Sequence, residues 1–137
     1  MEYHDLVKRA KKSMQYAHAP YSNFRVGAAL LCESGTIYTG SNIEVSSYSL
    51  TICAERVALF KAISEGEKKF SAIAVVSDDT EFTPPCGACR QVLWELAGDI
   101  DVIMGNSRGD LEITKLHTLL PEPFTAKHLQ RARKRHK

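Results

Sequence analysis

Three cysteines in two distant segments restrict the possible fold of this chain more than any other feature. Cys53 lies in Cys-Ala-Glu-Arg, whereas Cys86 and Cys89 lie in Pro-Cys-Gly-Ala-Cys. Both segments stand at the start of a predicted helix. A helix N-terminus stabilises a thiolate through its unpaired N–H groups and its dipole. A fold that brings these two helix starts to one point would therefore build a cluster of three thiolates.

The thiols of this chain are expected to be reduced. Residues Met1 to Lys12 are charged and lack the apolar stretch of a secretory signal, so we expect a cytoplasmic protein. No apolar run approaches the roughly 18 residues of a membrane span. Four cysteines in a chain of this kind point to metal or redox chemistry rather than to disulfides.

Zinc is the metal that suits three thiolates in tetrahedral geometry. A structural zinc needs a fourth protein ligand, but Cys32 lies in an apolar segment, where cysteine usually serves as a small core residue. No histidine has a metal-binding spacing to the cysteines; the histidines are His4, His18, His117, His128 and His136. Three ligands and an open position for water are typical of a catalytic zinc. We therefore expect one catalytic Zn²⁺ per chain.

Glu55 follows Cys53 by two residues, in the first turn of the same predicted helix. A carboxylate there can face the water on the metal without being a ligand, and it could then take a proton and pass it on. A ligand, a Glu two residues later and a distant Pro-Cys-x-x-Cys form the described signature of zinc deaminases that act on cytosine or adenine. Arg56 would donate to the sulfurs and offset the net charge of −1 that three thiolates give a Zn²⁺ site.

Each part of this pattern also has a simpler interpretation. A Cys-x-x-Cys pair alone could be a redox centre or half of a zinc knuckle, and a Glu in a first helical turn usually complements the helix dipole. A redox pair would leave Cys53 and Glu55 without a role. The joint pattern therefore favours zinc-dependent deamination.

The chain alternates between strand and helix patterns, which predicts a single α/β domain over residues 1–137. A turn at Glu33-Ser34-Gly35 joins the first two strands as a hairpin, so the sheet should be mixed, with helices covering it. The predicted helices are Glu2 to Tyr16, Ile52 to Glu65, Gly87 to Ala97, Lys115 to Leu119 and one from Ala126. The predicted strands are Phe24 to Cys32, Thr36 to Gly40, Phe70 to Ser77, Asp101 to Met104 and Leu111 to Thr114.

The net charge of +2 hides an uneven distribution. Five of the 18 basic residues crowd the tail at about 131–137, which leaves 13 basic against 16 acidic residues in the body. A body of that sign gives no general attraction for a polyanion, so we do not expect nucleic acid as a partner. The basic tail could touch nucleic acid, but a solvated, frayed helix end is the simpler interpretation.

At this point the sequence resembles the small, homotetrameric, zinc-dependent cytidine deaminases, and the resemblance covers nearly the whole chain. Matching segments occur in the family's order and at its spacings. They are Tyr21-Ser22-Asn23-Phe24-Arg25-Val26-Gly27-Ala28-Ala29-Leu30, Gly40-Ser41-Asn42-Ile43-Glu44, Cys53-Ala54-Glu55-Arg56, Pro85-Cys86-Gly87-Ala88-Cys89-Arg90-Gln91, and Leu119-Leu120-Pro121 with Phe124.

The resemblance implies a three-layer α/β/α fold around a mixed five-stranded sheet, assembled as a homotetramer whose active sites are shared between subunits. It implies hydrolytic deamination of cytidine and deoxycytidine to uridine and deoxyuridine, with release of ammonia, in pyrimidine salvage. The implied partner is therefore a small-molecule nucleoside, and the implied cofactor is Zn²⁺ on Cys53, Cys86 and Cys89, with Glu55 as the proton shuttle.

The resemblance also implies substrate contacts. These are Asn42 and Glu44 at the ribose hydroxyls, Phe24 and Val26 at the pyrimidine, Ala54 in the substrate site, and Tyr48 and Phe124 as residues contributed across a subunit interface. Asn42 and Glu44 alternate in an extended segment and can face one way, and amide and carboxylate groups suit sugar hydroxyls. Loop solvation explains this pair equally well from the residues alone, and Phe24 alone would more often be a core residue.

Two departures from the family concern substrate preference rather than zinc chemistry: Val45, where family members often carry Asn, and the segment 46–52. Alternatives therefore remain open. A blasticidin-type or other nucleoside-analogue deaminase would use the same zinc chemistry, and an enzyme editing polynucleotide cytosines would need a strand-binding platform. A non-catalytic zinc-binding or RNA-binding module would need four protein ligands and would leave Glu55 without a role.

Overall fold

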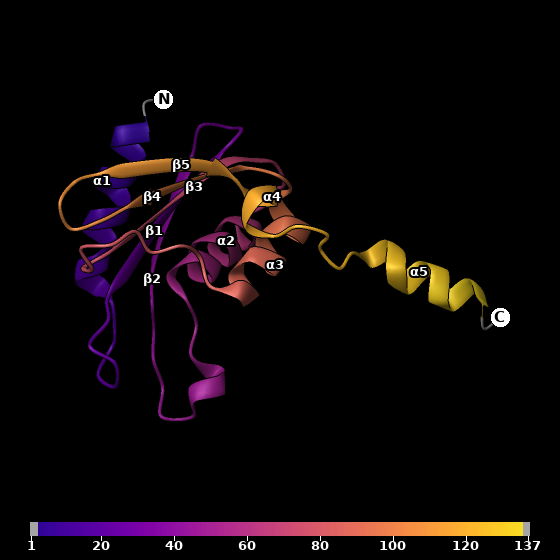
Figure 1. Ribbon diagram of the computed structural model, residues 1–137, viewed down its shortest axis with the longest axis horizontal. Helices are drawn as coiled ribbons and strands as arrows, with labels where there is room; N and C mark the ends of the chain where they lie inside the picture. The colour runs from indigo at the N-terminus through magenta and orange to yellow at the C-terminus, as the bar shows by residue number, and fades with distance from the viewer. Residues whose placement is uncertain (1–2, 136–137) are drawn as a thin grey trace.

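The computed structural model describes residues 3–135 and contains one mixed sheet of five strands in the order β2-β1-β3-β4-β5 (Figure 1). The strands are β1 (Val26–Cys32), β2 (Ile37–Ser41), β3 (Phe70–Ser77), β4 (Asp101–Gly105) and β5 (Leu111–Lys115). Only β3 and β4 pair in parallel, and the other neighbours are antiparallel. The predicted mixed sheet of five strands is confirmed.

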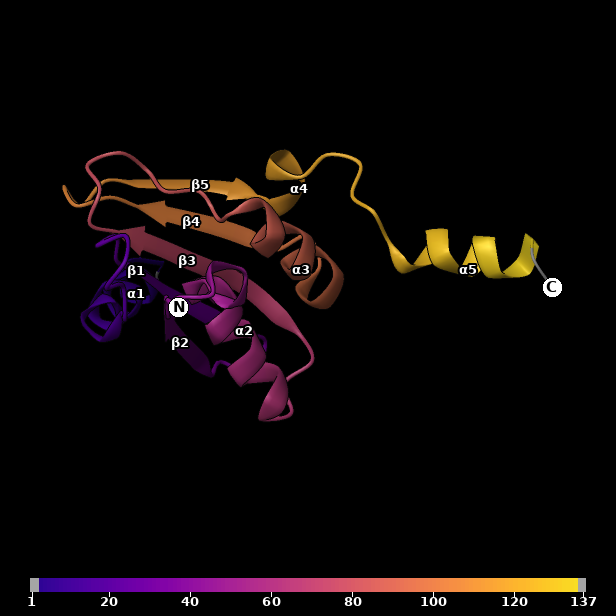
Figure 2. The same cartoon turned by 90° about the horizontal axis from the view of Figure 1, so that it is seen from below.

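Helices cover both faces of the sheet, which confirms the three-layer arrangement (Figure 2). The helices are α1 (Tyr3–Ser13), α2 (Ala54–Ser64), α3 (Gly87–Ala97), α4 (Leu116–Leu119) and α5 (Ala126–Arg135), with short 3-10 turns at Met14–Tyr16 and Tyr48–Leu50. Alternate residues of β1 divide the core between the layers. Ala29 packs with α1, whereas Ala28 and Leu30 pack with α2 and α3.

Two glycines let the helix layers approach the sheet closely. A Cβ on Gly27 would lie 2.0 Å from the carbonyl oxygen of Ala10 in α1. A Cβ on Gly40 would lie 2.5 Å from the carbonyl oxygen of Ala54 and 2.7 Å from the backbone nitrogen of Ala58, both in α2. The lack of a side chain at Gly40 therefore seats the first turn of α2 directly on β2.

Several element ends differ from the sequence prediction. The α-helical part of the first predicted helix ends at Ser13, whose hydroxyl donates to the carbonyls of Ala10 and Gly40. β1 begins at Val26 rather than Phe24, because Asn23 adopts a left-handed conformation with φ of 56°. Cys53 is the N-cap of α2, so this helix begins at Ala54 rather than Ile52.

The antiparallel pairing of β1 gathers three loops at one end of the strands. Val26 at the start of β1 lies opposite Ser77 at the end of β3, and Gly27 lies opposite Ser41 at the end of β2. Three segments therefore meet at this end of the sheet: the chain preceding β1, the chain between β2 and α2, and the chain between β3 and α3. Both cysteine-bearing helix starts belong to these loops.

Helix α5 projects away from the sheet and from the helices that cover it (Figures 1 and 2). Its side chains are exposed wherever they are described. No helix within residues 3–135 is both long and apolar enough to cross a membrane. Glu2 of the predicted first helix and Lys137 of the basic tail lie outside the described residues.

Candidate metal centre and substrate cavity

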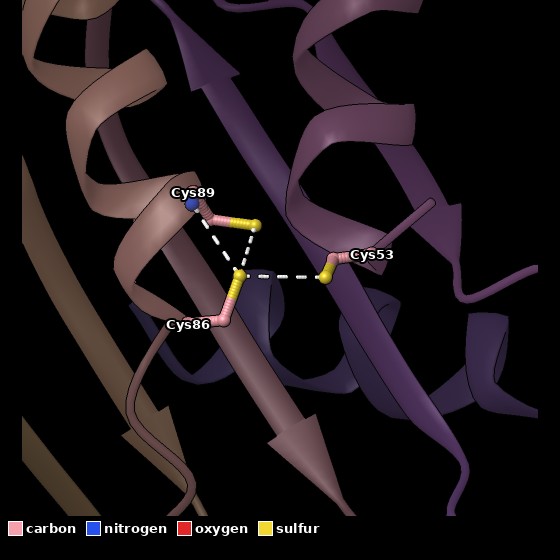
Figure 3. A group of neighbouring side chains, drawn as sticks. All are labelled: Cys53, Cys86 and Cys89. Carbon is pink, nitrogen blue, oxygen red and sulfur yellow. Dashed lines mark hydrogen bonds between the residues drawn. The ribbon is translucent and has the colours of Figure 1, made fainter. Parts of the chain in front are cut away.

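The three cysteines predicted to bind a metal meet between the N-termini of α2 and α3 (Figure 3). The Cys86 sulfur lies 3.4 Å from the Cys53 sulfur and 3.0 Å from the Cys89 sulfur, and all three sulfurs lie within 4.8 Å of one another. The backbone N–H of Cys89 donates to the Cys86 sulfur at 3.4 Å. Within residues 3–135, no other histidine, cysteine or carboxylate joins the group.

The three thiols do not share their protons equally: burial raises the pKa of Cys86 and a hydrogen bond to Cys53 raises that of Cys89, whereas the pKa of Cys53 is lowered. A hydrogen bond from the Cys89 thiol, followed by one from Arg56, lowers the pKa of Cys53 to about 5 despite partial burial. Arg56 Nη2 lies 3.5 Å from the Cys53 sulfur, and this contact raises the pKa of the guanidinium. Three sulfur donors with a compensating guanidinium fit one Zn²⁺ ion.

The Arg56 Nε atom gives an independent indication of charge at this site. It is buried and has no hydrogen-bond partner among the residues that the structure describes. A buried cationic donor without a partner is unfavourable unless negative charge lies close to it. Three thiolates around a divalent ion carry a net charge of −1 and provide that charge.

Glu55 lies in the first turn of α2, beside the sulfur cluster, and is only 3% exposed. Burial raises the pKa of its carboxyl group, and a hydrogen bond from its own backbone N–H offsets this only in part. The negative charge of Cys53 raises this pKa further. Glu55 is thus a desolvated carboxyl group held against the proposed ligands and able to exchange a proton there.

A cavity of about 320 Å³ opens beside the sulfur cluster. It brings together most of the residues that the sequence assigned to substrate binding, zinc binding or catalysis. These are Phe24, Val26, Asn42, Glu44, Cys53, Ala54, Glu55 and Cys86. Ser22, Thr51, Thr83 and Pro84 also line the cavity, and the sequence analysis gave them no role. The volume lies within the range of small-molecule sites, at roughly 300–1,000 Å³.

Asn42 and Glu44 are both buried at the wall of this cavity, at 8% and 6% exposure. The Asn42 side chain donates to the Phe24 carbonyl at 2.8 Å and accepts from the Val26 N–H at 3.0 Å. Glu44 accepts hydrogen bonds from the Ser22 hydroxyl and from the backbone N–H groups of Tyr21 and Ser22. The hydrogen bond from the Ser22 hydroxyl has the largest effect and lowers the pKa of Glu44. The two backbone hydrogen bonds also lower this pKa, whereas burial raises it.

The two aromatic residues predicted to act across a subunit interface do not line the cavity of their own chain. Tyr48 is 63% exposed and meets Tyr21 edge to face, with ring centroids 6.3 Å apart. Phe124 is 56% exposed and stacks on His128, with centroids 5.1 Å apart. The side-chain amide of Gln91 in α3 donates to the Phe124 carbonyl at 2.6 Å, so the segment before α5 is tied to the metal-site helix.

Comparisons with known proteins agree with this geometry. The family model described as the cytidine and deoxycytidylate deaminase zinc-binding region matches residues 1–106. A cytidine deaminase of Sporosarcina psychrophila is 50% identical over 133 residues, covering 96% of this chain and 98% of that protein. One of Halalkalibacterium halodurans is 51% identical over 125 residues, covering 90% and 95%. The crystal structure of cytidine deaminase from Burkholderia pseudomallei matches with a TM-score of 0.88 at 46% identity, covering 90% of this chain and 100% of that chain.

Proposed function

This chain belongs to the zinc-dependent cytidine and deoxycytidylate deaminase family, and we propose that it hydrolyses cytidine to uridine and ammonia. The observation that carries the proposal is the cluster of three cysteine sulfurs beside a cavity that Glu55 also lines. We extend the proposal to deoxycytidine, because both nucleosides carry the same base and would place it against the same cavity residues. Pyrimidine salvage in the cytoplasm is the role that such a reaction would serve.

Cys53, Cys86 and Cys89 would hold the metal, since their sulfurs converge within 4.8 Å. When bound there, Zn²⁺ acidifies water and so supplies the nucleophile for attack at C4 of the cytosine ring. Glu55 would then move the protons. It would accept one from the attacking water, deliver it to ring N3, and later carry a proton to the amino group that leaves as ammonia.

The remaining cavity residues would orient the nucleoside. Asn42 and Glu44 would bind ribose hydroxyls, since hydrogen bonds to the backbone hold each side chain in place. Within residues 3–135, each side chain also keeps hydrogen-bonding capacity that these bonds do not use. Phe24 and Val26 would lie along the pyrimidine, because both line the cavity beside the buried amide of Asn42. Ala54 would leave room next to the metal for the reacting edge of the base.

We also propose that the protein is a homotetramer whose neighbouring chains complete each active site. An apolar hollow of about 460 Å³ on the described surface supports this, with lining residues that include Ile43, Val45, Leu50 and Phe60. Contiguous exposed apolar surface of this kind usually marks an interface. Exposed Tyr48 lies next to this surface in sequence, and Phe124 stands outside its own cavity, so both are free to enter a neighbouring one.

Ammonia release from cytidine is the direct test of this function. Purified protein loaded with Zn²⁺ should release ammonia in proportion to uridine formed, and a chelator should abolish the activity until Zn²⁺ is restored. Deoxycytidine, blasticidin S and a cytosine-containing oligonucleotide should be assayed alongside. Turnover of blasticidin S or of the oligonucleotide at rates rivalling that of cytidine would overturn the substrate assignment, and absence of ammonia from every substrate would overturn deamination.

A further inference from the structure

We propose that Ser22 is a positioning residue for sugar recognition, because its hydroxyl group directs the Glu44 carboxylate so that a single acceptor position remains for the nucleoside. The inference rests on the proposed function, since it takes Glu44 as a group that receives a sugar hydroxyl. Ser22 itself lines the cavity and is exposed, so its hydroxyl is not held there by burial.

The direction of the Ser22 hydroxyl follows from its two partners. Its oxygen accepts a hydrogen bond from the backbone N–H of Phe24 at 3.0 Å, and that N–H can only donate. Its other partner is the Glu44 Oε2 atom, which in a carboxylate can only accept. The single proton of the hydroxyl group must therefore point to Glu44, and the turn at Asn23 holds it in that direction.

Counting the acceptor positions of Glu44 shows what this hydrogen bond achieves. An ionised carboxylate offers about four lone-pair positions. Oε1 accepts from the N–H groups of Tyr21 and Ser22, at 3.0 and 3.1 Å, and Oε2 accepts from the Ser22 hydroxyl. Among the hydrogen bonds formed within residues 3–135 these three are the ones that reach the Glu44 carboxylate, so one position on Oε2 is open to a ligand. Ser22 thereby fixes both the rotation of the carboxylate and the direction in which it can accept.

Without the Ser22 hydroxyl, the Oε2 atom would keep neither its partner nor its orientation. The two backbone N–H groups hold only Oε1, which leaves the carboxylate free to tilt about that anchor. A tilted carboxylate would bind a sugar hydroxyl less well but would not alter the metal cluster or Glu55. The loss should therefore depend on whether the ligand carries ribose hydroxyls, which a general structural defect would not do.

The experiment measures competitive inhibition constants of uridine and of 2′,3′-dideoxyuridine against cytidine deamination, together with kcat and KM for cytidine. In Ser22→Ala, Ki for uridine should rise about tenfold, the loss expected for one hydrogen bond to a charged group. Ki for dideoxyuridine should be unchanged, so the ratio of the dideoxyuridine constant to the uridine constant should shrink about tenfold. KM for cytidine should rise while kcat changes less.

Ser34→Ala is the matched control, because the Ser34 hydroxyl also donates to a carboxylate, that of Glu67, beyond the far end of β1. It should leave both inhibition constants unchanged. Ser22→Thr retains the hydroxyl and should restore the wild-type ratio. Ser22→Cys keeps the size but provides only a weak donor, so it should reduce the ratio even where Ser22→Ala fails to fold.

An unchanged ratio in Ser22→Ala or Ser22→Cys would overturn the proposal, whether both ligands weakened together or neither did. The wild-type measurement separates this outcome from failure of the proposed function. If wild-type protein releases no ammonia from cytidine, deamination itself is wrong. If wild-type protein is active and the ratio does not move, only the role of Ser22 is wrong.

Discussion

The close contact between Gly40 and α2 makes Gly40→Ala a test of how the fold holds the metal site. The added Cβ would lie 2.5 Å from the Ala54 carbonyl oxygen, whereas ordinary van der Waals contact begins at 3.4 Å. Both close neighbours are backbone atoms of α2, so no flexible side chain can move aside. Helix α2 would therefore have to withdraw from β2 by about 0.9 Å, the difference between these two distances.

That displacement should be visible in both stability and zinc binding. Overpacking of this kind costs about 1–3 kcal/mol, which at about 4 °C per kcal/mol lowers the Tm by roughly 4–12 °C. Cys53 is the N-cap of α2 and would move with it relative to Cys86 and Cys89 at the start of α3. A misplacement of about 1 Å can reduce catalysis by about 100-fold. We expect Gly40→Ala to lose kcat/KM and to release zinc at lower chelator concentrations.

Gly27→Ala is the matched variant for this experiment, because the same added methyl group there would press on α1, on the opposite face of the sheet. Thermal unfolding, zinc content under a chelator titration and cytidine deamination should be measured for both variants. Gly27→Ala should lose stability while its folded fraction keeps zinc. A wild-type Tm for Gly40→Ala would refute the steric argument, and equal zinc retention by the two destabilised variants would refute the link from Gly40 to the metal.

Three further predictions test other parts of the molecule. Glu55→Gln should keep the Tm and one Zn²⁺ per chain but lose about 100-fold to 10,000-fold in kcat, as measured by ammonia release; turnover near the wild-type rate would contradict its role as proton shuttle. Hydrogen bonds from Lys115 and then Tyr3 lower the pKa of Asp101, so the stability that it contributes is present above the ordinary aspartate pKa and is lost as the pH falls through its lower folded pKa. Asp101→Asn should therefore lower the stability at pH 7 by less than about 1 kcal/mol, because the Lys115 side chain is 53% and the Asp101 side chain 26% exposed and solvent screens the pair. The difference between wild type and variant, measured by thermal unfolding, should shrink as the pH falls below about 4; a difference that stays constant as the pH falls would contradict the assignment. Deletion of residues 131–137 should leave cytidine turnover unchanged in a steady-state assay, and a clear loss would show that the basic tail takes part in catalysis or assembly.

The features set by local sequence were predictable. Three of these features depend only on neighbouring residues: the Gly-containing turn after β1, the alternation of Ala28, Ala29 and Leu30, and the cysteines at two helix starts. The sheet and the cysteine cluster that they predicted are confirmed. The joint spacing of Cys53 and the Pro-Cys-Gly-Ala-Cys segment was informative because few structures other than a metal centre need it.

Features set by distant partners were not predictable in the same way. β1 begins late because Asn23 turns the chain, and the Asn42 side chain in addition occupies both the Phe24 carbonyl and the Val26 N–H. Ser22 was missed because its partner Glu44 lies 22 residues away, and a serine before an asparagine is ordinary in any turn. The roles of Tyr48 and Phe124 stay predictions, since their contacts would lie between chains.

The helix starts at the metal centre carry a further thermodynamic consequence. Serine, threonine, aspartate and asparagine are the residues that cap helices well, yet α2 and α3 both begin after a cysteine, and Cys53 makes no side-chain capping hydrogen bond. Replacing a good cap typically costs about 1 kcal/mol. The two helices therefore give up some stability of their own because their first residues are cysteines that can bind metal. Metal binding and the ordering of both helix starts are therefore coupled, because the residues that begin the two helices are also the proposed metal ligands.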